Sequence, residues 1–529
     1  MQQLYFMQKI NSKLLYPLAA LATLASCGGG EKAEPTKPLN IVYIMTDDHT
    51  RQMMSSYDNR HIETPNLDRI AEGGVLFENA FVCNSISGPS RAALLTGKHS
   101  HKNGKMNNHT TFDGSQQTVQ QLLKEVGYQT AMIGKWHLDS SPTNFDFWEI
   151  LPGQGSYYNP DFITPNGNTK YEGYVTDIIT DMSIGWMENE RKKEDPFCLF
   201  IHHKVAHRNW MSDTTHLALY EDKEFELPGN FYDDYEGRVA AAEQEMRIAS
   251  DHDMDIVNDL KMIREGVQTR LSGAYIHGEY ARLNEKQKAA WDNHYNPIID
   301  AFYAADLEGN ELAEWKYQRY MRDYAKTVKS LDENVGRVLD YLEENDMMEN
   351  TVIIYTSDQG FYMGEHGWFD KRFMYEESMS TPLVMHLPSH LKKIGNISLL
   401  AQNIDFAPTM LDIAGADIPE DIQGVSLLPL LKDEVDPKEW RKSLYYHFYE
   451  FPSEHMVKRH YGVRTERYKL IHFYNDIDTW ELFDLQEDIE EMHNLYGKPG
   501  YEEITKELKA ELKNLQEKYD DPIREEYPL

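Results

Sequence analysis

A serine stands at the predicted start of a short helix. Ser87 opens the stretch SGPSR, in which Pro89 suits the first helical position, while residues 92–95 favour helix and Gly97 ends it. Free backbone N–H groups at a helix N-terminus attract anions, and Arg91 adds a positive charge one turn further on. A hydroxyl beside an anion site is a candidate nucleophile toward an oxyanion ester, with a simple helix cap as the alternative interpretation.

Polar side chains follow two apolar runs that are typical of buried strands. Asp47 and Asp48 follow the run IVYIM, and Asp358 and Gln359 follow VIIY. In an open α/β sheet, ligands bind outside the carboxyl ends of the strands. Carboxylate and amide oxygens are the ligands that Ca²⁺ prefers. Either pair alone is also typical of a turn, so the predicted calcium site depends on the two pairs together.

Basic side chains follow two further predicted strands. Lys135 and His137 come after the run TAMIG, His207 follows FCLFI, and Lys371 lies in GEHGWFDK. Isolated histidines are usually structural and isolated lysines are usually solvated. Their positions after strands at the same sheet edge favour a functional site instead. Histidine exchanges protons near neutral pH, so the set suits acid–base chemistry.

The elements that position these residues predict an α/β fold. Strands alternating with helices indicate a large, mixed, mostly parallel sheet flanked by helices. After about residue 431, short runs joined by turns predict a small C-terminal α+β subdomain with an antiparallel sheet. We therefore expect a catalytic domain at 38–431 and a subdomain at 432–529. A charged, helix-prone insertion at about 227–303 interrupts the first, and we hypothesise that it shapes the rim of the substrate cleft.

The stretch around Ser87 resembles the signature of type I sulfatases, in which a Cys or Ser is converted to formylglycine. The matching pattern at residues 87–97 is S-x-P-S-R-x-x-x-L-T-G, and it includes the Pro and Arg that the maturation enzymes read. Cys83 does not fit, because Ser85 occupies the place where the pattern has Pro. The resemblance covers nearly the whole chain from residue 41 onward and implies an alkaline-phosphatase-like sandwich.

The resemblance also implies a role for each candidate. Formylglycine made from Ser87 attacks sulfur as the hydrated aldehyde, and Arg91 orients it. Lys135 and Lys371 would bind the sulfate oxygens. His137 would be the base that releases sulfate, and His207 would donate a proton to the leaving sugar oxygen. The implied Ca²⁺ ligands are Asp47, Asp48, Asp358, Gln359 and Ser87. The family commonly has Pro where this chain has Ala206, a small departure beside the proton donor.

Three segments narrow the resemblance. WEILPGQGSYYNP at 148–160, HRNW at 207–210 and GEHG at 364–367 are similar to the mucin-desulfating and N-acetylglucosamine-6-sulfatase group of gut Bacteroidetes. The implied reaction is exo-type hydrolysis of 6-O-sulfated N-acetylglucosamine on host glycans such as mucin or heparan sulfate. Polar candidates for substrate contacts, each equally compatible with a plain surface position, are His366, Arg372, His455 and His460.

Three alternatives stay open at this point. The chain could act on another sulfate position of a glycan, or use an unmodified Ser87 as the nucleophile of a phosphodiesterase or phosphonate hydrolase. It could also be a glycan-binding lipoprotein on a degenerate scaffold, which the filled catalytic positions disfavour. The added His and Asp residues of a two-metal zinc phosphatase do not stand out in the sequence, which favours a single hard cation.

Composition excludes several classes of protein. The 529 residues are 41% hydrophobic and 12% aromatic, which is typical of a globular protein. A formal net charge of −34 argues against binding to nucleic acid or to anionic membrane surfaces. Any anion site must therefore be a local basic pocket. The three cysteines provide no disulfide framework.

The N-terminus resembles an export signal. Two lysines precede an apolar run too short to span a membrane, and LASC resembles a lipobox, so residues 1–27 are predicted to be a lipoprotein signal peptide ending in Cys27. A plain signal peptide is the alternative. Residues 28–37 then form a flexible tether. We expect an exported lipoprotein held at the outer membrane by its lipid alone, facing the periplasm or the surface. A Ser-type site also needs a maturase, and a radical enzyme suited to oxygen-free conditions is expected.

Overall fold

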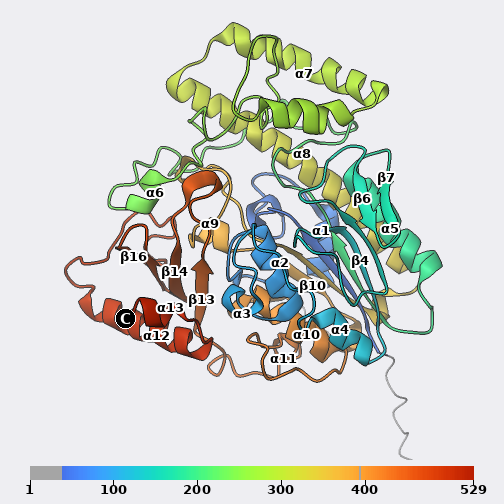
Figure 1. The fold of residues 1–529 in the computed structure, drawn as a ribbon, viewed down its shortest axis with the longest axis vertical. Helices are drawn as coiled ribbons and strands as arrows, with labels where there is room; N and C mark the ends of the chain where they lie inside the picture. Colours follow the sequence, from blue (N-terminus) through green and yellow to red (C-terminus); the bar gives the residue numbers. More distant parts are fainter. Residues whose placement is uncertain (1–37, 392–394) are drawn as a thin grey trace, which may run out of the picture. The chain divides into compact units, whose positions relative to one another are not determined.

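The computed structural model describes residues 38–391 and 395–529 (Figure 1). A ten-stranded mixed sheet has the order β11-β2-β10-β9-β1-β8-β4-β5-β6-β7, and its centre, from β9 to β5, is parallel. The strands are β1 Asn40–Thr46, β2 Gly74–Phe77, β4 Gln129–Lys135, β5 Phe147–Leu151, β6 Asp161–Thr164, β7 Gly167–Lys170, β8 Phe197–His202, β9 Thr351–Ser357, β10 Leu383–His386 and β11 Gly395–Ile397. The predicted class, a mixed and mostly parallel sheet, is confirmed.

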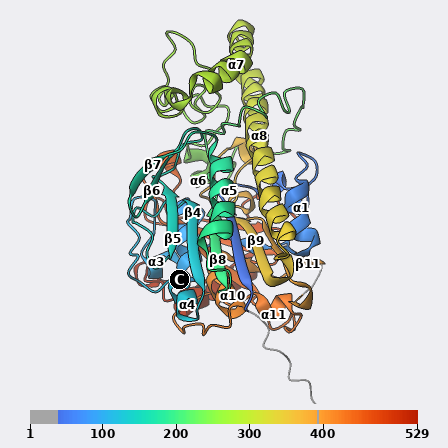
Figure 2. The same ribbon diagram turned by 90° about the vertical axis from the view of Figure 1, so that its right-hand side faces the viewer.

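Helices cover both faces of this sheet. The helices of the main body are α1 Pro65–Glu72, α2 Ser87–Thr96, α3 Ser100–Asn103, α4 Val119–Glu125, α5 Val175–Gly185, α8 Gly309–Glu344, α9 Glu376–Met379, α10 Phe406–Ile413 and α11 Leu428–Leu431. In Figure 2, α5 and α8 pass in front of the strands, and α1 packs beside α8. Helices α2, α4 and α10 pack together on the opposite face.

The position of β1 at the centre of the sheet explains why its sequence is a continuous apolar run. Ile41 and Tyr43 belong to the apolar cluster that includes side chains of α2 and α10, whereas Val42 and Ile44 belong to the cluster that includes α8. Successive side chains of a strand point to opposite faces, so a strand covered on both faces needs apolar residues at every position. All seven residues of β1 are buried.

Helix α2 begins slightly earlier than the sequence indicated. We expected Ser87 to lie just before the helix, but it is the first helical residue, with Ile86 as N-cap and no side-chain cap. The helix ends as predicted, at Gly97 in the left-handed conformation with φ 65°. Every residue of α2 is buried, so the helix start lies inside the protein rather than on its surface.

The C-terminal part forms an antiparallel meander. Its strands and helices are β13 Ser443–Phe448, β14 His460–Thr465, β15 Tyr468–Phe473, β16 Thr479–Asp484, α12 Glu502–Lys518 and α13 Ile523–Glu526, drawn in orange to red in Figure 1. A separate apolar cluster joins this sheet to α12. Strands β3 (Ala80–Phe81) and β12 (Ala401–Gln402) form a separate two-stranded sheet.

The inserted segment, residues 227–303, contains less helix than we expected. It holds the short α6 (Val239–Glu243) and most of α7 (Glu285–Ala305), separated by irregular backbone and single turns. Helix α7 starts at a capping box in which the Asn284 side chain accepts from the Gln287 backbone. Figure 1 shows α7 beside the first turns of α8, beyond the edge of the large sheet.

Residues 38–529 form one compact unit. The predicted signal peptide, the lipobox Cys27 and the tether at 28–37 lie outside the described residues, and the boundary at 431 stays a prediction. Among the helices of residues 38–391 and 395–529, none is both long and apolar enough to cross a membrane.

Candidate active site

Neighbouring strands deliver the candidate residues to one edge of the sheet. Strands β9, β1, β8 and β4 are adjacent and parallel, so their carboxyl ends lie together. Asp47 and Asp48 follow β1, and Asp358 follows β9. Lys135 ends β4, and His207 lies in the loop after β8. The sheet order therefore brings together residues that lie far apart in the sequence.

Ser87 Oγ lies among these side chains. It donates to Asp47 Oδ1 at 3.4 Å and accepts from the Gln359 amide at 3.2 Å. Ser87 is 1% exposed. Among the described residues, no histidine nitrogen forms a hydrogen bond with this hydroxyl. A serine nucleophile needs a base or a metal to activate it, so the hydroxyl has no such activation from a neighbouring histidine.

Arg91 holds two of the carboxylates together. Its Nη2 lies 2.8 Å from Asp47 Oδ2 and 3.0 Å from Asp358 Oδ2, and its Nη1 donates to the Lys135 carbonyl at 2.7 Å. His202, which the sequence analysis did not single out, contacts both the Arg91 guanidinium at 3.3 Å and the same carbonyl at 3.2 Å. The guanidinium is thereby fixed beside Ser87 from several sides.

Two lysines also contact the carboxylates of Asp47 and Asp48. Lys135 Nζ lies 2.5 Å from Asp47 Oδ2, and Lys371 Nζ lies 2.7 Å from Asp48 Oδ2. Both lysines are nearly inaccessible to solvent. Burial lowers the pKa of Lys135 to about 8, against the opposing effect of Asp47. The site therefore concentrates both signs of charge in a small buried volume.

The surroundings shift the pKa values of the three carboxylates in different directions. Burial alone would raise the pKa of Asp47, yet Lys135 and the neighbouring cationic groups hold it well below its ordinary value. Burial raises the pKa of Asp48 to about 6 and that of Asp358 to about 7, in each case with a further increase from Asp47. Carboxylates this close and this buried are stabilised by an added cation.

Gln359 supplies a test of whether these residues fit a hard cation. Its Nε2 lies 2.5 Å from Asp48 Oδ1 and 3.2 Å from Ser87 Oγ, while its buried Oε1 has no hydrogen-bond partner. The two ends of an amide are almost equal in size, so rotation by half a turn places Oε1 toward Asp48 and Ser87. A cation at this point would then be offered oxygens of Asp48, Ser87 and Gln359, and these hard donors fit Ca²⁺.

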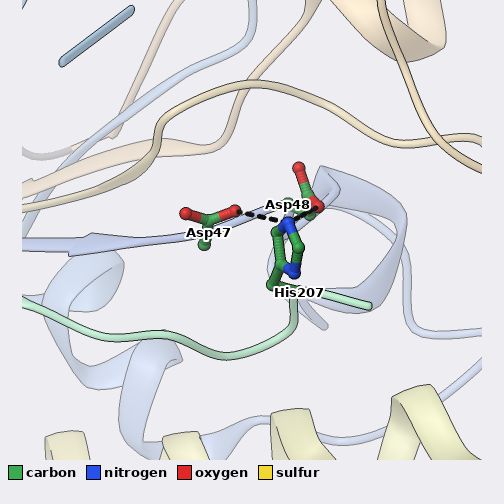
Figure 3. A group of neighbouring side chains, drawn as sticks. All are labelled: Asp47, Asp48 and His207. Carbon is green, nitrogen blue, oxygen red and sulfur yellow. Dashed lines mark ion pairs between the residues drawn. The ribbon is translucent and has the colours of Figure 1, made fainter. Parts of the chain in front are cut away.

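His207 lies closer to the carboxylates than its predicted role required. Figure 3 shows its Nε2 turned toward Asp47 and Asp48, at 4.0 and 3.9 Å from their oxygens. Its Nδ1 lies 2.6 Å from the Arg208 carbonyl, which can only accept, so the proton of the neutral ring lies on Nδ1. Burial, assisted by Lys135, lowers the pKa of His207 well below its ordinary value. Nε2 is thus a free lone pair at the centre of the site.

His137 follows β4, two residues after Lys135. Its backbone has φ 53°, it is partly buried, and its Nδ1 has no hydrogen-bond partner among the described residues. Burial and the nearby Lys135 lower its pKa well below the ordinary value. The ring is therefore neutral and able to accept a proton.

Sequence reasoning missed Lys204 and Gln154. Lys204 is 2% exposed, with its Nζ 4.7 Å from the centre of the Tyr157 ring and 3.2 Å from the Gln154 carbonyl. The Gln154 side chain accepts from Lys135 Nζ at 2.5 Å, so this residue contacts both lysines. The available signal for Lys204 was its position in HHKVAH, three residues before His207.

Two of the four candidates for substrate contacts lie beside the site. Arg372 Nε lies 3.1 Å from Asp370 Oδ1, and His455 Nε2 lies 3.4 Å from Asp370 Oδ2. Asp370 directly precedes Lys371 and was also missed. Two nitrogens of Arg372 and Oδ1 of Asp370 are buried without a well-formed hydrogen bond. This group, Asp370, Arg372 and His455, is called the sugar subsite below.

The other two candidates lie in the interior of the protein. His366 is fully buried, with its Nδ1 2.7 Å from Asp233 and its ring against Trp368. His460 is also fully buried, packs against Phe373, and accepts from the Met374 backbone at 3.0 Å. Aromatic neighbours enclose both rings, and among the described residues His366 Nε2 has no hydrogen-bond partner. Their role in substrate contacts stays a prediction.

Comparisons with known proteins agree with this architecture. Residues 39–416 match the family model named Sulfatase, and residues 364–518 match the C-terminal model of N-sulphoglucosamine sulphohydrolase. N-acetylglucosamine-6-O-sulfatase of Bacteroides thetaiotaomicron is 50% identical over 520 residues, which cover 97% of this chain and 92% of that protein. Human N-acetylglucosamine-6-sulfatase is 26% identical over 79% of this chain and 68% of its own length.

Solved structures of other proteins also superpose on this chain. A structure of a protein in complex with its substrate, D-glucosamine-2-N,6-O-disulfate, superposes with a TM-score of 0.88 at 50% identity, covering 92% of this chain and 99% of that one. A phosphonate monoester hydrolase from Silicibacter pomeroyi superposes with a TM-score of 0.66 at 18% identity over 92% of this chain and 96% of that one, which shows a shared fold alone.

Proposed function

The chain belongs to the sulfatase family, and we propose that it is an exo-acting carbohydrate sulfatase that hydrolyses the 6-O-sulfate ester of N-acetylglucosamine on host glycans. One observation carries this proposal: 97% of the chain aligns at 50% identity with a protein named N-acetylglucosamine-6-O-sulfatase. The substrate named for the superposed complex also carries a 6-O-sulfate on a glucosamine ring.

We propose that Ser87 is converted to formylglycine, which would supply a hydrated aldehyde whose one hydroxyl attacks sulfur and whose other allows sulfate to leave. The match of residues 87–97 to the signature that maturation enzymes read supports this. Arg91, fixed by Asp47 and Asp358, is placed to orient this group. Conversion requires an anaerobic sulfatase-maturating enzyme as a partner.

We propose that the carboxylates of Asp47, Asp48 and Asp358, together with the Gln359 amide oxygen and position 87, hold Ca²⁺. The ion would supply positive charge that stabilises the developing negative charge of the reaction. The buried Oε1 of Gln359 and the raised pKa values of Asp48 and Asp358 support this assignment.

The remaining side chains divide the binding and proton transfers. The Lys135 and Lys371 ammonium groups are placed to hold sulfate oxygens, and Lys204 adds a third positive charge nearby. As the attacking hydroxyl bonds to sulfur, its proton would pass to the free Nε2 of His207 and from there to the sugar oxygen as the bond between sulfur and that oxygen breaks. Neutral His137 takes the proton that is lost when sulfate leaves. Arg372 and Asp370 form an ion pair whose buried atoms lack a well-formed hydrogen bond, so these atoms suit the hydroxyls of a sugar ring.

The cellular context remains a proposal from the sequence. The lipobox at Cys27 supports export, attachment of a lipid and anchoring at the outer membrane, facing the periplasm or the cell surface. The substrate is then a glycan outside the cytoplasm.

Positional selectivity tests the proposed function. The enzyme, matured in an anaerobic host, is given glucosamine derivatives sulfated at the 6-O, 3-O or 2-N position, and released sulfate is measured by ion chromatography. We expect release from the 6-O ester alone, and none from a Ser87→Ala variant. Release from another position at a comparable rate would contradict the proposed substrate. Turnover of phosphodiesters by unmodified Ser87, with sulfate esters untouched, would favour the phosphodiesterase alternative.

A further inference from the structure

We propose that Arg208 is a positioning residue through which the inserted segment, residues 227–303, sets the geometry of the sugar subsite. The inference rests on the proposed function and adds a role for a segment whose sequence carries no chemical pattern. Arg208 follows the proton donor His207 directly, but its side chain points to other partners.

Arg208 is tied to the inserted segment by a buried fork. Its Nε lies 2.6 Å from Asp259 Oδ1 and its Nη2 lies 2.8 Å from Asp259 Oδ2, while Nη2 also donates to the Asp253 carbonyl at 3.2 Å. The Asp259 side chain is fully buried and that of Arg208 is 10% exposed. Two parallel charged hydrogen bonds fix both the position and the plane of a guanidinium.

The remaining nitrogen of this guanidinium reaches the C-terminal part of the chain. Arg208 Nη1 lies 3.0 Å from Glu454 Oε1 and 3.4 Å from His455 Nε2. The face of the guanidinium lies 5.2 Å from the centre of the Phe369 ring, and the His455 ring meets the same phenyl group edge-on. Arg208 therefore packs directly against His455 and the residue before Asp370.

The inserted segment also fixes the orientation of the His455 ring. His455 Nδ1 lies 2.6 Å from the Glu245 carbonyl, and the Glu245 amide donates to the His455 carbonyl at 2.8 Å. A carbonyl oxygen only accepts, so the Nδ1 N–H donates to Glu245 and fixes the plane of the ring. Nε2 then faces the Arg208 guanidinium and lies 3.4 Å from Asp370 Oδ2.

A third set of bonds joins the inserted segment to the loop that carries the subsite. The Ile248 amide donates to the Gly367 carbonyl at 2.8 Å, and the Phe369 amide donates to the Met246 carbonyl at 3.0 Å. Phe369 comes just before Asp370 and Lys371 in the sequence. The inserted segment thus contacts the sugar subsite from two sides, through backbone pairing and through Arg208.

The test separates sugar positioning from chemistry. Mature wild type and an Asp259→Asn variant are compared for KM and kcat on 6-O-sulfated N-acetylglucosamine, and for inhibition by inorganic sulfate, which fills the sulfate site alone. Because the amide that replaces the carboxylate cannot accept two charged bonds, we expect KM to rise about 10- to 100-fold. The kcat and the inhibition constant of sulfate stay within about threefold of wild type, as the lysines are not changed.

Two further variants keep the result interpretable. Arg208→Lys retains the charge but cannot form the fork, so it is expected to raise KM as Asp259→Asn does. Asp323→Asn is the matched control, because Asp323 on α8 holds Lys261 of the inserted segment at 2.9 Å and bonds no residue of the sugar subsite. This control is expected to lower thermal stability and to leave KM unchanged.

Several outcomes would overturn the inference. An unchanged KM in both Asp259→Asn and Arg208→Lys would do so, as would a loss confined to kcat, which would show that Arg208 acts through His207. An equal rise of KM in Asp323→Asn would reduce the effect to general loosening of the inserted segment. The proposed function fails differently, by a mature wild type that binds sulfate but does not hydrolyse the 6-O-sulfated sugar.

Discussion

Replacing Lys135 by alanine is expected to strengthen calcium binding while abolishing turnover. In the structure, Lys135 Nζ lies 2.5 Å from Asp47 Oδ2, so it occupies an oxygen that the proposed cation needs. Calcium must break this contact before it can bind. A sulfate ion that binds Lys135 after calcium has displaced it would therefore strengthen calcium binding. Calcium would strengthen sulfate binding by the same factor, since coupling between two ligands is reciprocal.

The size of the effect follows from that one contact. A hydrogen bond between charged groups contributes about 1.5–3 kcal/mol, and each 1.4 kcal/mol is a factor of ten in a binding constant. Removing it should tighten calcium binding by about 10- to 150-fold. The measurement is isothermal titration of Ca²⁺ into chelator-treated protein whose Ser87 is unmodified.

Lys204→Ala is the matched control for this experiment. Lys204 also lies near Asp47, but its hydrogen bond goes to the Gln154 carbonyl at 3.2 Å and not to a carboxylate. Its removal reports the general effect of one positive charge less in the pocket. If Lys135→Ala binds calcium no more tightly than Lys204→Ala, the reasoning that the lysine and the cation compete for Asp47 is refuted.

Three further predictions concern other parts of the site and the C-terminal sheet. His207→Ala should lower kcat by about 100- to 10,000-fold, with calcium affinity unchanged in titration, whereas weaker calcium binding would make His207 a ligand. Gly134→Ala should lower the free energy of unfolding, measured in urea, by about 3 kcal/mol. The reason is that φ of Gly134 is 105° and a Cβ would lie 2.0 Å from the His202 carbonyl oxygen. An unchanged urea midpoint would contradict this close approach. Burial raises the pKa of Glu481 to about 8 from an ordinary value of 4.5. The stability from its bound proton is present below pH 4.5 and is lost as pH rises through about 8. Glu481→Gln should therefore melt at a higher temperature than wild type above pH 8, with a smaller difference at pH 5, and equal differences at both would contradict the raised pKa.

The positions of the main site residues could be predicted because they follow the ends of recognisable strands. The run of apolar residues in β1 identifies a strand buried on both faces, and the residues after such a strand lie at the sheet edge where ligands bind. Asp47, Asp48 and Asp358 are brought together by that rule alone. The rule does not predict which side chains contact these carboxylates.

Burial of a polar residue by distant segments could not be predicted. Lys204 has the pattern of a solvated lysine, and it is buried because the Tyr157 ring covers it, with Glu279 of the inserted segment nearby. His366 and His460 have the pattern of site histidines, and they are interior because aromatic side chains from several elements enclose them. Such enclosures join residues far apart in the sequence, and no local pattern records them.

The antiparallel part of the large sheet could not be predicted from local sequence either. Strand β10 has only four residues and runs antiparallel between β9 and β2, and its place follows from partners about 30 and 300 residues away along the chain. The role of the inserted segment belongs to the same class. Its contacts with Arg208 and His455 become visible only when the C-terminal part is folded against it.

The mass of the peptide that contains Ser87 tests the central claim most directly. The protein is produced in an anaerobic host together with the maturase, digested, and measured alongside its activity on 6-O-sulfated N-acetylglucosamine. The account predicts a loss of two hydrogens at Ser87, as expected for formylglycine, together with release of sulfate. An intact serine in a preparation that releases sulfate at full rate would contradict the proposed nucleophile. An intact serine with sulfate esters untouched and phosphodiesters hydrolysed would contradict the proposed reaction.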